Sequence, residues 1–155
     1  MAIDHWVTPG VDGIHAPGED HFSYPRWVLP ILHNEHWTVT RIDWIDQRLL
    51  VFDSLHRGVN TDCLRLVQAI VESIFRFSAP QKPFPGATWK NWSVTPMFVP
   101  YQANSYDCGC WVMAQIFANL RGYDCTGLTT QTDIDRWRRY IYDLFVSLPE
   151  ADIVN

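Results

Sequence analysis

Between residues 27 and 55, hydrophobic and polar positions follow the two-residue period of β-strands. Three β-prone stretches, WVLPIL, HWTVTRIDW and RLLVFDSL, are separated by short polar turns at 33–35 and 46–47. The second stretch alternates, so one of its faces can be buried while the other is exposed. Pro30 interrupts the first stretch and cannot donate a ladder hydrogen bond, which predicts an edge strand or a bulge there.

Two later segments, residues 61–77 and 132–147, have instead the period of amphipathic helices. Short polar side chains at 60–61 and at 132–133 are suited to cap these helices, because their oxygens accept hydrogen bonds from the free N–H groups of a first turn. The predicted buried faces are Val67, Ile70, Val71 and Ile74 in the first helix and Ile134, Trp137, Ile141, Leu144 and Phe145 in the second.

A third helix is predicted over residues 109–120, with Gly122 as its C-terminal stop. Before it, residues 79–92 are rich in Pro and Gly and are predicted to form a long loop. Residues 93–99 are predicted to form a short strand that Pro96 interrupts. The predicted buried stripe of the third helix is Met113, Ile116, Phe117 and Leu120.

The order of these elements is strands, helix, strand and two helices. It predicts an α+β fold in which a small mixed or antiparallel β-sheet packs against helices. A chain of 155 residues is long enough to bury one core, so we predict a single domain over residues 1–155. Residues 1–25 lack periodicity and are expected to be loop-like or an incomplete N-terminal part, with the core over residues 27–155.

Composition and charge narrow the class of protein. Hydrophobic residues make up 47% and charged residues 19% of the chain, which indicates a folded globule. The net charge of -5 is unlike the basic surface of a nucleic-acid-binding domain. No apolar run reaches the roughly 18 residues of a membrane span, and the N-terminus lacks the pattern of a secretory signal. The four cysteines are therefore expected to be reduced thiols in an intracellular protein, nuclear or cytoplasmic.

Cys108 stands where a loop meets the predicted 109–120 helix. The thiolate is the reactive form of cysteine, and the unpaired N–H groups of a helix N-terminus stabilise an anion there. Gly109 has no Cβ, so a substrate carbonyl could approach the backbone N–H closely. On position alone, a nucleophile and a small buried hydrophobic side chain explain Cys108 equally well.

The other three cysteines are expected to be buried side chains without chemistry. Structural zinc sites use Cys pairs separated by two to four residues, whereas one residue separates Cys108 from Cys110. His33 and His36 have ligand-like spacing but lie on a turn and a strand start, away from the cysteines. No metal site is therefore predicted. The three cysteines are Cys63, Cys110 and Cys125.

A nucleophilic thiol needs a base, and that base needs an orienting group. His36 opens the alternating strand, and Asp53 stands at the end of the next one. If the two strands pair antiparallel through the turn at 46–47, these residues become cross-strand neighbours within hydrogen-bond reach. Asp53 would then orient the imidazole and stabilise its charge. Asp43 and Asp46 are rival acids, but they lie in mid-strand and at the far turn.

Acyl transfer also needs a donor aimed at the developing oxyanion, and the side-chain amide of Gln102 can supply it beside a backbone N–H. Taken alone, Gln102 is better explained as an exposed loop residue. However, four elements occur in order along the chain: HW at 36–37, FDSL at 52–55, Gln102, and DCG at 107–109. In this order and spacing they resemble the ubiquitin-like-protein-specific cysteine proteases. This group includes the SUMO (sentrin) proteases and is distantly similar to adenovirus protease.

The resemblance runs from about Trp27 to Leu120 and implies a papain-like cysteine-protease fold with the nucleophile at a helix N-terminus. It also implies that Trp37 helps to cover a narrow tunnel that admits the Gly-Gly tail of the modifier, with Gly109 as a second substrate-binding residue. The family's W-L-x-D-like segment is not found in residues 1–25, so the N-terminal modifier-binding surface is expected to be shortened or remodelled. The implied catalytic residues are His36, Asp53, Gln102 and Cys108.

The activity implied by the resemblance is that of a thiol peptidase or isopeptidase without a cofactor. It would cleave after the C-terminal Gly-Gly of SUMO or a related ubiquitin-like protein. The expected partners are such modifiers and their conjugates, with neither nucleic acid nor a membrane involved. Two alternatives stay open. In the first, the chain is a catalytically impaired domain that binds a modifier without cleaving it. In the second, it applies the same chemistry to ubiquitin or to a viral or mobile-element polyprotein.

Overall fold

The structure is a computed structural model of the chain and describes residues 24–56, 58–78, 88–97 and 101–149. Most of the predicted N-terminal loop and of the predicted loop over 79–92 therefore lies outside the described residues. The elements are β1 (Arg26–His33), β2 (His36–Asp43), β3 (Arg48–Phe52), α2 (Thr61–Ser78), the short 3-10 helix η2 (Trp89–Asn91), β4 (Ser93–Pro96), α3 (Cys108–Leu120) and α4 (Gln131–Ser147).

The β-sheet has four strands in the order β1-β2-β3-β4. The first three strands pair antiparallel, and β4 pairs parallel to β3, so the sheet is mixed. Asn34 and Glu35 both have positive φ, 49° and 59°, as a tight two-residue hairpin between β1 and β2 requires. Pro30 lies in the edge strand β1 and Pro96 ends the opposite edge strand. The predicted α+β fold with a small mixed sheet is confirmed.

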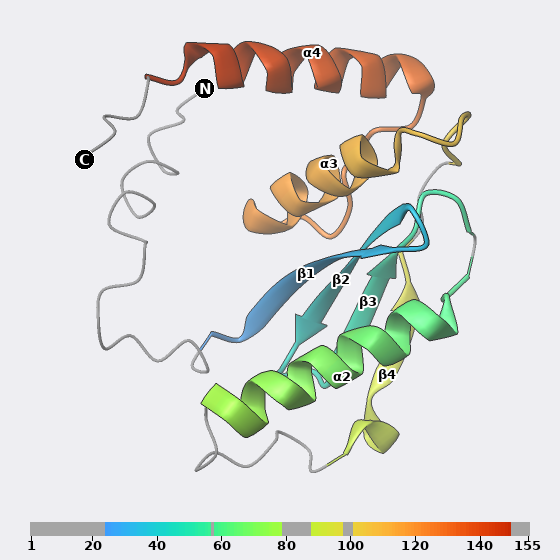
Figure 1. Ribbon diagram of the computed structural model, residues 1–155, viewed down its shortest axis with the longest axis vertical. Coiled ribbons are helices and arrows are strands. Elements are labelled where there is room, and N and C mark those ends of the chain that lie inside the picture. The colour runs from blue at the N-terminus through green and yellow to red at the C-terminus, as the bar shows by residue number, and fades with distance from the viewer. Residues whose placement is uncertain (1–23, 57, 79–87, 98–100, 150–155) are drawn as a thin grey trace.

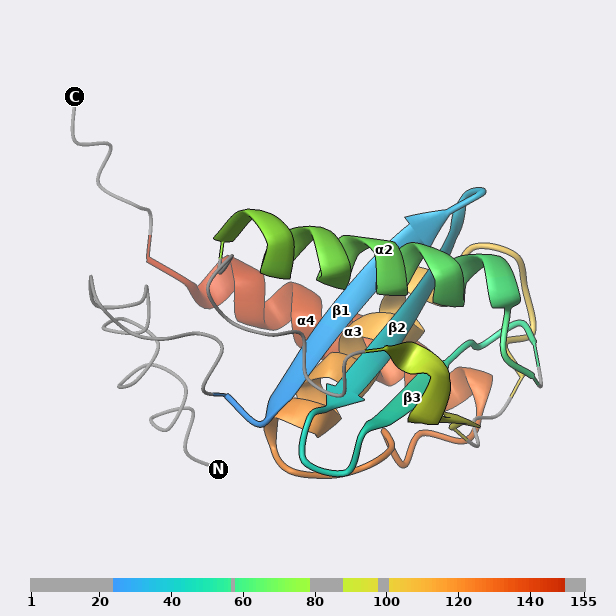
Figure 2. The same cartoon turned by 90° about the horizontal axis from the view of Figure 1, so that it is seen from below.

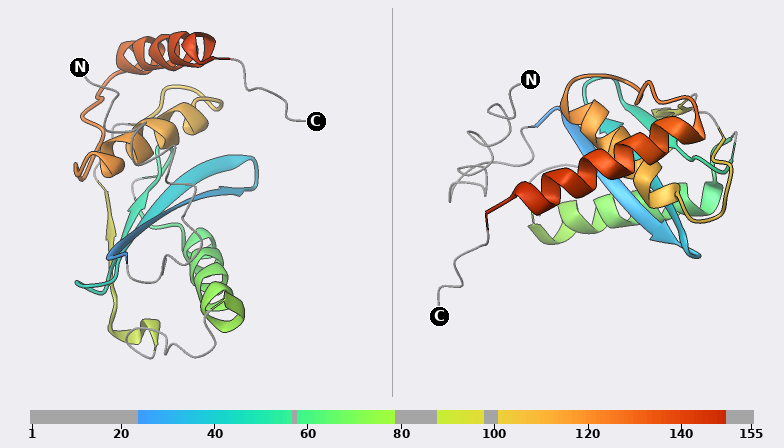
Figure 3. Two further views of the ribbon diagram at one scale, coloured as in Figure 1. Left: turned by 90° about the vertical axis from the view of Figure 1, so that its left-hand side faces the viewer. Right: turned by 90° about the horizontal axis from the view of Figure 1, so that it is seen from above.

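The sheet is covered by helices on both faces (Figure 1). Helix α2 lies on one face and α3 on the other, and α4 lies over the outer side of α3 (Figures 2 and 3). Strand β2 is the central strand that both layers need: Ile42 packs in the cluster with α2, Val39 packs in the cluster with α3, and both are fully buried. Side chains of a strand alternate between faces, so one strand supports both cores.

The span of helix α2 agrees with its prediction, although Ile70 and Ile74 of the predicted buried face are only partly buried. Asn60 caps it, because its side-chain oxygen accepts hydrogen bonds from the backbone N–H groups of Asp62 and Cys63 at 3.0 and 3.2 Å. Val67 and Val71 are fully buried on its inner face. This face and the sheet form the first core, which contains Ile31, Ile42, Leu49, Val67, Val71, Phe75 and Trp92.

The predicted buried stripe of the third helix is wrong. Met113 is 41% and Leu120 is 56% exposed. Helix α3 is apolar around most of its circumference, so its hydrophobic period did not single out the face that meets the sheet. The predicted stop at Gly122 is confirmed, since Gly122 has a φ of 83° and donates its N–H to the Asn119 carbonyl. The buried residues of α3 are Cys108, Trp111, Val112, Ala114, Gln115 and Ala118.

The predicted cap of α4 is wrong by two or three residues. Thr130 is the N-cap, and it forms a capping box with Asp133, in which each side chain bonds the other's backbone N–H. Ile134 is fully buried, as predicted, whereas Phe145 is 65% exposed because the end of α4 extends beyond the part of α3 that it covers. Among the described residues, no helix is long and apolar enough to cross a membrane.

Candidate active site

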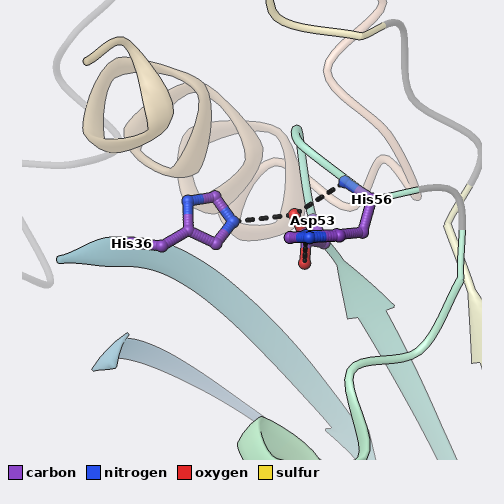
Figure 4. A group of neighbouring side chains, drawn as sticks. All are labelled: His36, Asp53 and His56. Atoms are coloured by element: carbon purple, nitrogen blue, oxygen red, sulfur yellow. Dashed lines mark hydrogen bonds and ion pairs between the residues drawn. The ribbon is translucent and has the colours of Figure 1, made fainter. Parts of the chain in front are cut away.

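His36 and Asp53 meet at one end of the sheet. His36 is the first residue of β2, and Asp53 directly follows Phe52, the last residue of β3, which is paired with Val39. This register brings the two side chains together diagonally across the strands. Nε2 of His36 lies 2.7 Å from Oδ1 of Asp53, so the expected hydrogen bond is present (Figure 4).

The rival acids are engaged elsewhere. Asp43 lies at the far end of β2, where its carboxylate accepts hydrogen bonds from Arg26 Nε and from the backbone N–H of Asp46. The carboxylate of Asp46 lies 3.8 Å from Arg48. Asp53 is therefore the acid that the antiparallel pairing of β2 and β3 presents to His36.

The other ring nitrogen of His36 is available. Nδ1 is buried and has no hydrogen-bond partner among the described residues. A buried polar atom without a partner is uncommon and calls for an explanation. An imidazole that is held by a carboxylate through one nitrogen and is free at the other has the arrangement of a general base.

Cys108 is the first residue of α3, and it is buried. The backbone N–H of Trp111 donates to the Asp107 carbonyl, so the N–H groups before it in this turn have no partner within the helix. Asp107 is the N-cap, but its side chain makes no capping bond. The carboxylate instead accepts hydrogen bonds from Asn104, Gln131 and Arg138. The first turn of α3 thus keeps uncapped donors next to the thiol.

A contact between Trp37 and Gly109 connects the strand end with this helix start. A Cβ placed on Gly109 would lie 3.5 Å from Cδ1 of the Trp37 ring, so the ring covers the backbone of that residue. Trp37 follows His36 in the chain, and Gly109 follows Cys108. The contact therefore brings the chain neighbours of the base and of the thiol together, although no hydrogen bond to Cys108 is present among the described side chains.

Gln102 is buried rather than an exposed loop residue. Its Oε1 accepts a hydrogen bond from Ser54 Oγ at 2.7 Å, and its Nε2 donates to the Asn104 carbonyl at 2.6 Å. Its backbone N–H also donates to the Ser54 carbonyl at 2.9 Å. An amide carries two N–H donors, so one remains for another acceptor. The segment after Asp53 thus holds Gln102 in a fixed orientation.

His56 is a member of the site that the sequence did not indicate. Its Nδ1 lies 3.0 Å from Oδ2 of Asp53. The backbone N–H groups of Leu55 and His56 donate to Oδ1 of the same carboxylate at 2.9 and 3.1 Å. An Asp that bonds backbone N–H groups two and three residues later is a common turn. That pattern predicts the turn at Asp53, but not the direction of the His56 ring.

The remaining cysteines differ in exposure. Cys63 is buried, as predicted, and burial raises the pKa of its thiol. Burial also raises the pKa of the partly buried Cys110, with a smaller contribution from nearby Cys108. The prediction that Cys125 is buried is wrong: it is exposed in the segment between α3 and α4, where no apolar periodicity places a side chain inside.

Two imidazoles and a carboxylate could in principle bind a metal. The ligand atoms of His36, Asp53 and His56 lie within 4.8 Å of one another. Ligands around a tetrahedral zinc ion, each about 2.0–2.2 Å from the metal, are separated by more than about 3 Å. The 2.7 Å between His36 and Asp53 is instead a direct hydrogen bond. The group is arranged as an acid–base pair rather than as a metal clamp.

A histidine on a strand end, a carboxylate behind it, and a cysteine at the start of a helix are the components of a papain-like cysteine protease. A comparison with protein-family models agrees. Residues 15–147 match the model of the Ulp1 protease family, C-terminal catalytic domain. The chain belongs to this family. The prediction made from the HW, FDSL, Gln102 and DCG elements is confirmed at the level of the family.

Solved structures of SUMO proteases share the fold. The SUMO protease Ulp1 with its catalytic cysteine oxidised to a sulfonic acid is 20% identical, with a TM-score of 0.66 over 92% of this chain. A Ulp1 protease domain in complex with Smt3, the yeast ortholog of SUMO, is 20% identical and has a TM-score of 0.64 over 92% of this chain. The Ulp1-like SUMO protease catalytic domain of Chaetomium thermophilum is 22% identical and has a TM-score of 0.54 over 76% of this chain. The chain spans 61%, 60% and 45% of these chains, respectively. No curated protein sequence matches significantly.

Proposed function

We propose that the chain is a thiol peptidase or isopeptidase that cleaves after the C-terminal Gly-Gly of SUMO or a related ubiquitin-like modifier. The observation that carries the proposal is the state of His36. One ring nitrogen is bonded to Asp53 at 2.7 Å, and the other is buried and free of protein partners among the described residues. A ring held in this way is prepared to exchange a proton with Cys108.

The proposed reaction proceeds through an acyl-enzyme. His36 accepts the thiol proton as the sulfur of Cys108 attacks the scissile carbonyl, and it then protonates the leaving amine. Asp53 stabilises the imidazolium during both transfers. The free N–H of the Gln102 amide and the uncapped N–H groups at the start of α3 stabilise the oxyanion. Water then attacks the thioester, with His36 as general base, and releases the free carboxylate and the thiol.

The proposed preference for glycine rests on the Trp37 ring. That ring is 37% exposed and lies over Gly109, so its outer face is open to a substrate next to the thiol. A peptide that lies along this outer face can approach both the ring and the thiol most closely where it has no side chains, which favours a Gly-Gly tail. SUMO is the first candidate, because the three solved structures compared above are of SUMO proteases, one of them bound to Smt3. We place the activity in the nucleus or cytoplasm.

A probe panel tests this proposal. The intact protein is incubated with SUMO, ubiquitin and another ubiquitin-like protein, each carrying an electrophile at its C-terminal glycine, and adducts are read by intact mass. We expect the SUMO probe to label wild type at Cys108 and to leave Cys108→Ala unlabelled, whereas Cys125→Ala, which removes an exposed thiol, should label like wild type. Labelling that persists in Cys108→Ala would contradict the proposal. Labelling by the ubiquitin probe alone would show that the substrate is ubiquitin and not SUMO.

A further inference from the structure

The carboxylate of Asp53 is shared by two histidines. Oδ1 accepts from Nε2 of His36 and from the backbone N–H groups of Leu55 and His56. Oδ2 accepts from Nδ1 of the His56 ring, and within the described part of the chain this is its single donor. The two imidazole rings bond the same carboxylate and contact each other edge to face, with centroids 5.8 Å apart and an interplanar angle of 68° (Figure 4).

The bond to the second oxygen has a distinct geometric effect. The carboxylate is planar, so a rotation about its bond to Cβ moves both oxygens together. A donor on Oδ2 therefore resists the same rotation that would turn Oδ1 away from His36, and it adds to the restraint from the three donors to Oδ1. Because Asp53 is buried, Oδ2 would otherwise be a poorly solvated anionic oxygen.

We propose that His56 is a positioning residue for the catalytic pair: its imidazole holds Oδ2 of Asp53 and thereby keeps Oδ1 directed at His36. This inference rests on the proposed function of His36 and Asp53. Since the carboxylate only accepts, the proton of the neutral His56 ring resides on Nδ1. The side chain of His56 is 60% exposed, so apart from its edge-to-face contact with His36 the ring adds little to the core.

The alternative is a surface histidine whose ring orientation has no effect. The positioning role and the alternative can be tested separately, because the backbone and the ring of His56 bond different oxygens of Asp53. The N–H of His56 holds the turn through its own bond to Oδ1, and this bond is independent of the side chain. Replacing the ring therefore leaves the turn intact and removes one donor. Asparagine offers a matched replacement, because its Nδ2 occupies nearly the position of the histidine Nδ1 and also donates.

The experiment measures the alkylation of individual cysteines by iodoacetamide at neutral pH, read by peptide mass. The proteins are wild type, His56→Ala, His56→Asn and His36→Ala. Cys125, which is exposed, serves as the internal reference in each protein. We expect His56→Ala to slow the alkylation of Cys108 about three- to tenfold, the scale of one hydrogen bond, while the rate at Cys125 is unchanged. His56→Asn should return Cys108 to within about twofold of wild type.

The outcomes separate this inference from the proposed function. If His36→Ala slows the alkylation of Cys108 and His56→Ala does not, the positioning role of His56 is overturned and the catalytic pair stands. If His36→Ala leaves the alkylation rate of Cys108 unchanged, the proposed pair of His36 and Asp53 is wrong, and the proposed role of His56 is wrong with it. If His56→Asn reacts as slowly as His56→Ala, the donor is not what matters and the inference is wrong. Unchanged thermal unfolding of both His56 variants excludes misfolding as the cause.

Discussion

Ser54 is the residue whose contacts best explain how a loop glutamine becomes a directed donor. Its hydroxyl and its carbonyl both bond Gln102, at 2.7 and 2.9 Å, and both residues are buried. The Asn104 carbonyl can only accept, so it defines which end of the amide carries nitrogen. The Ser54 hydroxyl then holds the oxygen end. Directing an oxyanion donor in advance is what makes such a donor effective.

Ser54→Ala is expected to lower kcat about three- to tenfold while KM changes less than twofold, because the amide of Gln102 loses its fixed orientation but not its presence. The measurement is steady-state hydrolysis of whichever modifier substrate the probe panel identifies. Ser73→Ala is the matched control, since among the described residues the hydroxyl of Ser73 donates to the Ala69 carbonyl of its own helix and to nothing in the site. An equal loss in both variants would show that the effect is general and not directed through Gln102.

The cysteines should differ in the pH at which they react. Burial raises the pKa of Cys63 and of Cys110, so the thiolate of each forms at higher pH than that of a free thiol. We therefore expect the exposed Cys125 to be alkylated before either as the pH is raised from 7 to 9, measured residue by residue. Cys110 reacting as early as Cys125 would contradict the burial of its side chain against the second core.

For single residues, the sequence predicts those contacts that follow directly from the pairing of two strands. His36 and Asp53 stand at opposite ends of a hairpin, so their meeting followed from antiparallel register. Ser54 and His56 were missed, because the direction of a side chain in a turn is not encoded in any periodicity. Gln102 was assigned to the surface when taken alone. Its burial depends on Ser54, which is distant in sequence, and only the family resemblance indicated its role.

Among the elements, α4 depends most visibly on its first turn. Thr130→Ala should lower the free energy of unfolding by about 1 kcal/mol, the usual cost of a lost N-cap, whereas Thr130→Ser keeps the hydroxyl and should cost less. Chemical denaturation monitored by circular dichroism measures both. No difference between the two variants would mean that the cap does not contribute to stability.

The same cap should weaken in acid. The hydroxyl of Thr130 and the backbone of Thr129 hold the pKa of Asp133 below its ordinary value. A carboxyl with a lowered folded-state pKa stabilises the fold above its unfolded pKa and loses this contribution as the pH falls through the folded pKa. The stability difference between wild type and Asp133→Asn should therefore shrink toward acid pH in denaturation curves. A difference that is independent of pH would contradict an ionised capping carboxylate.

The errors in the helices have physical causes. The stripe of α3 was misplaced because this helix is covered by the sheet on one side and by α4 on the other, so apolar side chains surround it. The cap of α4 was recognisable in principle, since Thr130 and Asp133 have the spacing of a capping box. The apolar period begins only at Ile134, so the helix start is predicted next to that residue and not at Thr130.

In the whole molecule, Asp107 joins the outer helix to the helix that carries the thiol. It is fully buried and accepts from Gln131 and Arg138 of α4. These bonds turn the carboxylate away from the first turn of α3, where an N-cap carboxylate would otherwise accept from the helix N–H groups. Helix α4 thus keeps free the first N–H groups of α3, which are the proposed oxyanion donors.

Arg138→Ala is therefore expected to lower both stability and kcat. Loss of one charged hydrogen bond to a buried carboxylate should cost about 1–3 kcal/mol in the free energy of unfolding. Oδ1 of Asp107, which loses Arg138, can then accept from the first turn of α3 and compete with the oxyanion, so kcat should fall at a temperature where the variant is fully folded. Arg136→Ala, an exposed neighbour on the same helix, is the control. A loss of stability without a loss of kcat would limit Asp107 to a structural role.

The fold as a whole followed from the sequence because its element order is simple and its strands and first helix are strongly periodic. The layering did not follow. Helix α4 packs on α3 through Ile134 in the second core, through Trp137 and Tyr140 against Phe117, and through Gln131 and Arg138 at Asp107. An apolar stripe shows that a helix is covered but not by which surface, so the order of the layers could not be predicted.

The pairing of the strands has a consequence for how the chain acquires reactivity. His36 and Asp53 belong to a local antiparallel meander, whereas Cys108 reaches them only after α2, β4 and the loop to α3 have been placed. Contacts between near neighbours in sequence form earlier than distant ones, because less chain entropy is lost in closing them. We therefore expect a refolding chain to join His36 and Asp53 before Cys108 comes near them. Until α3 is placed, the thiol should react like that of an unfolded chain.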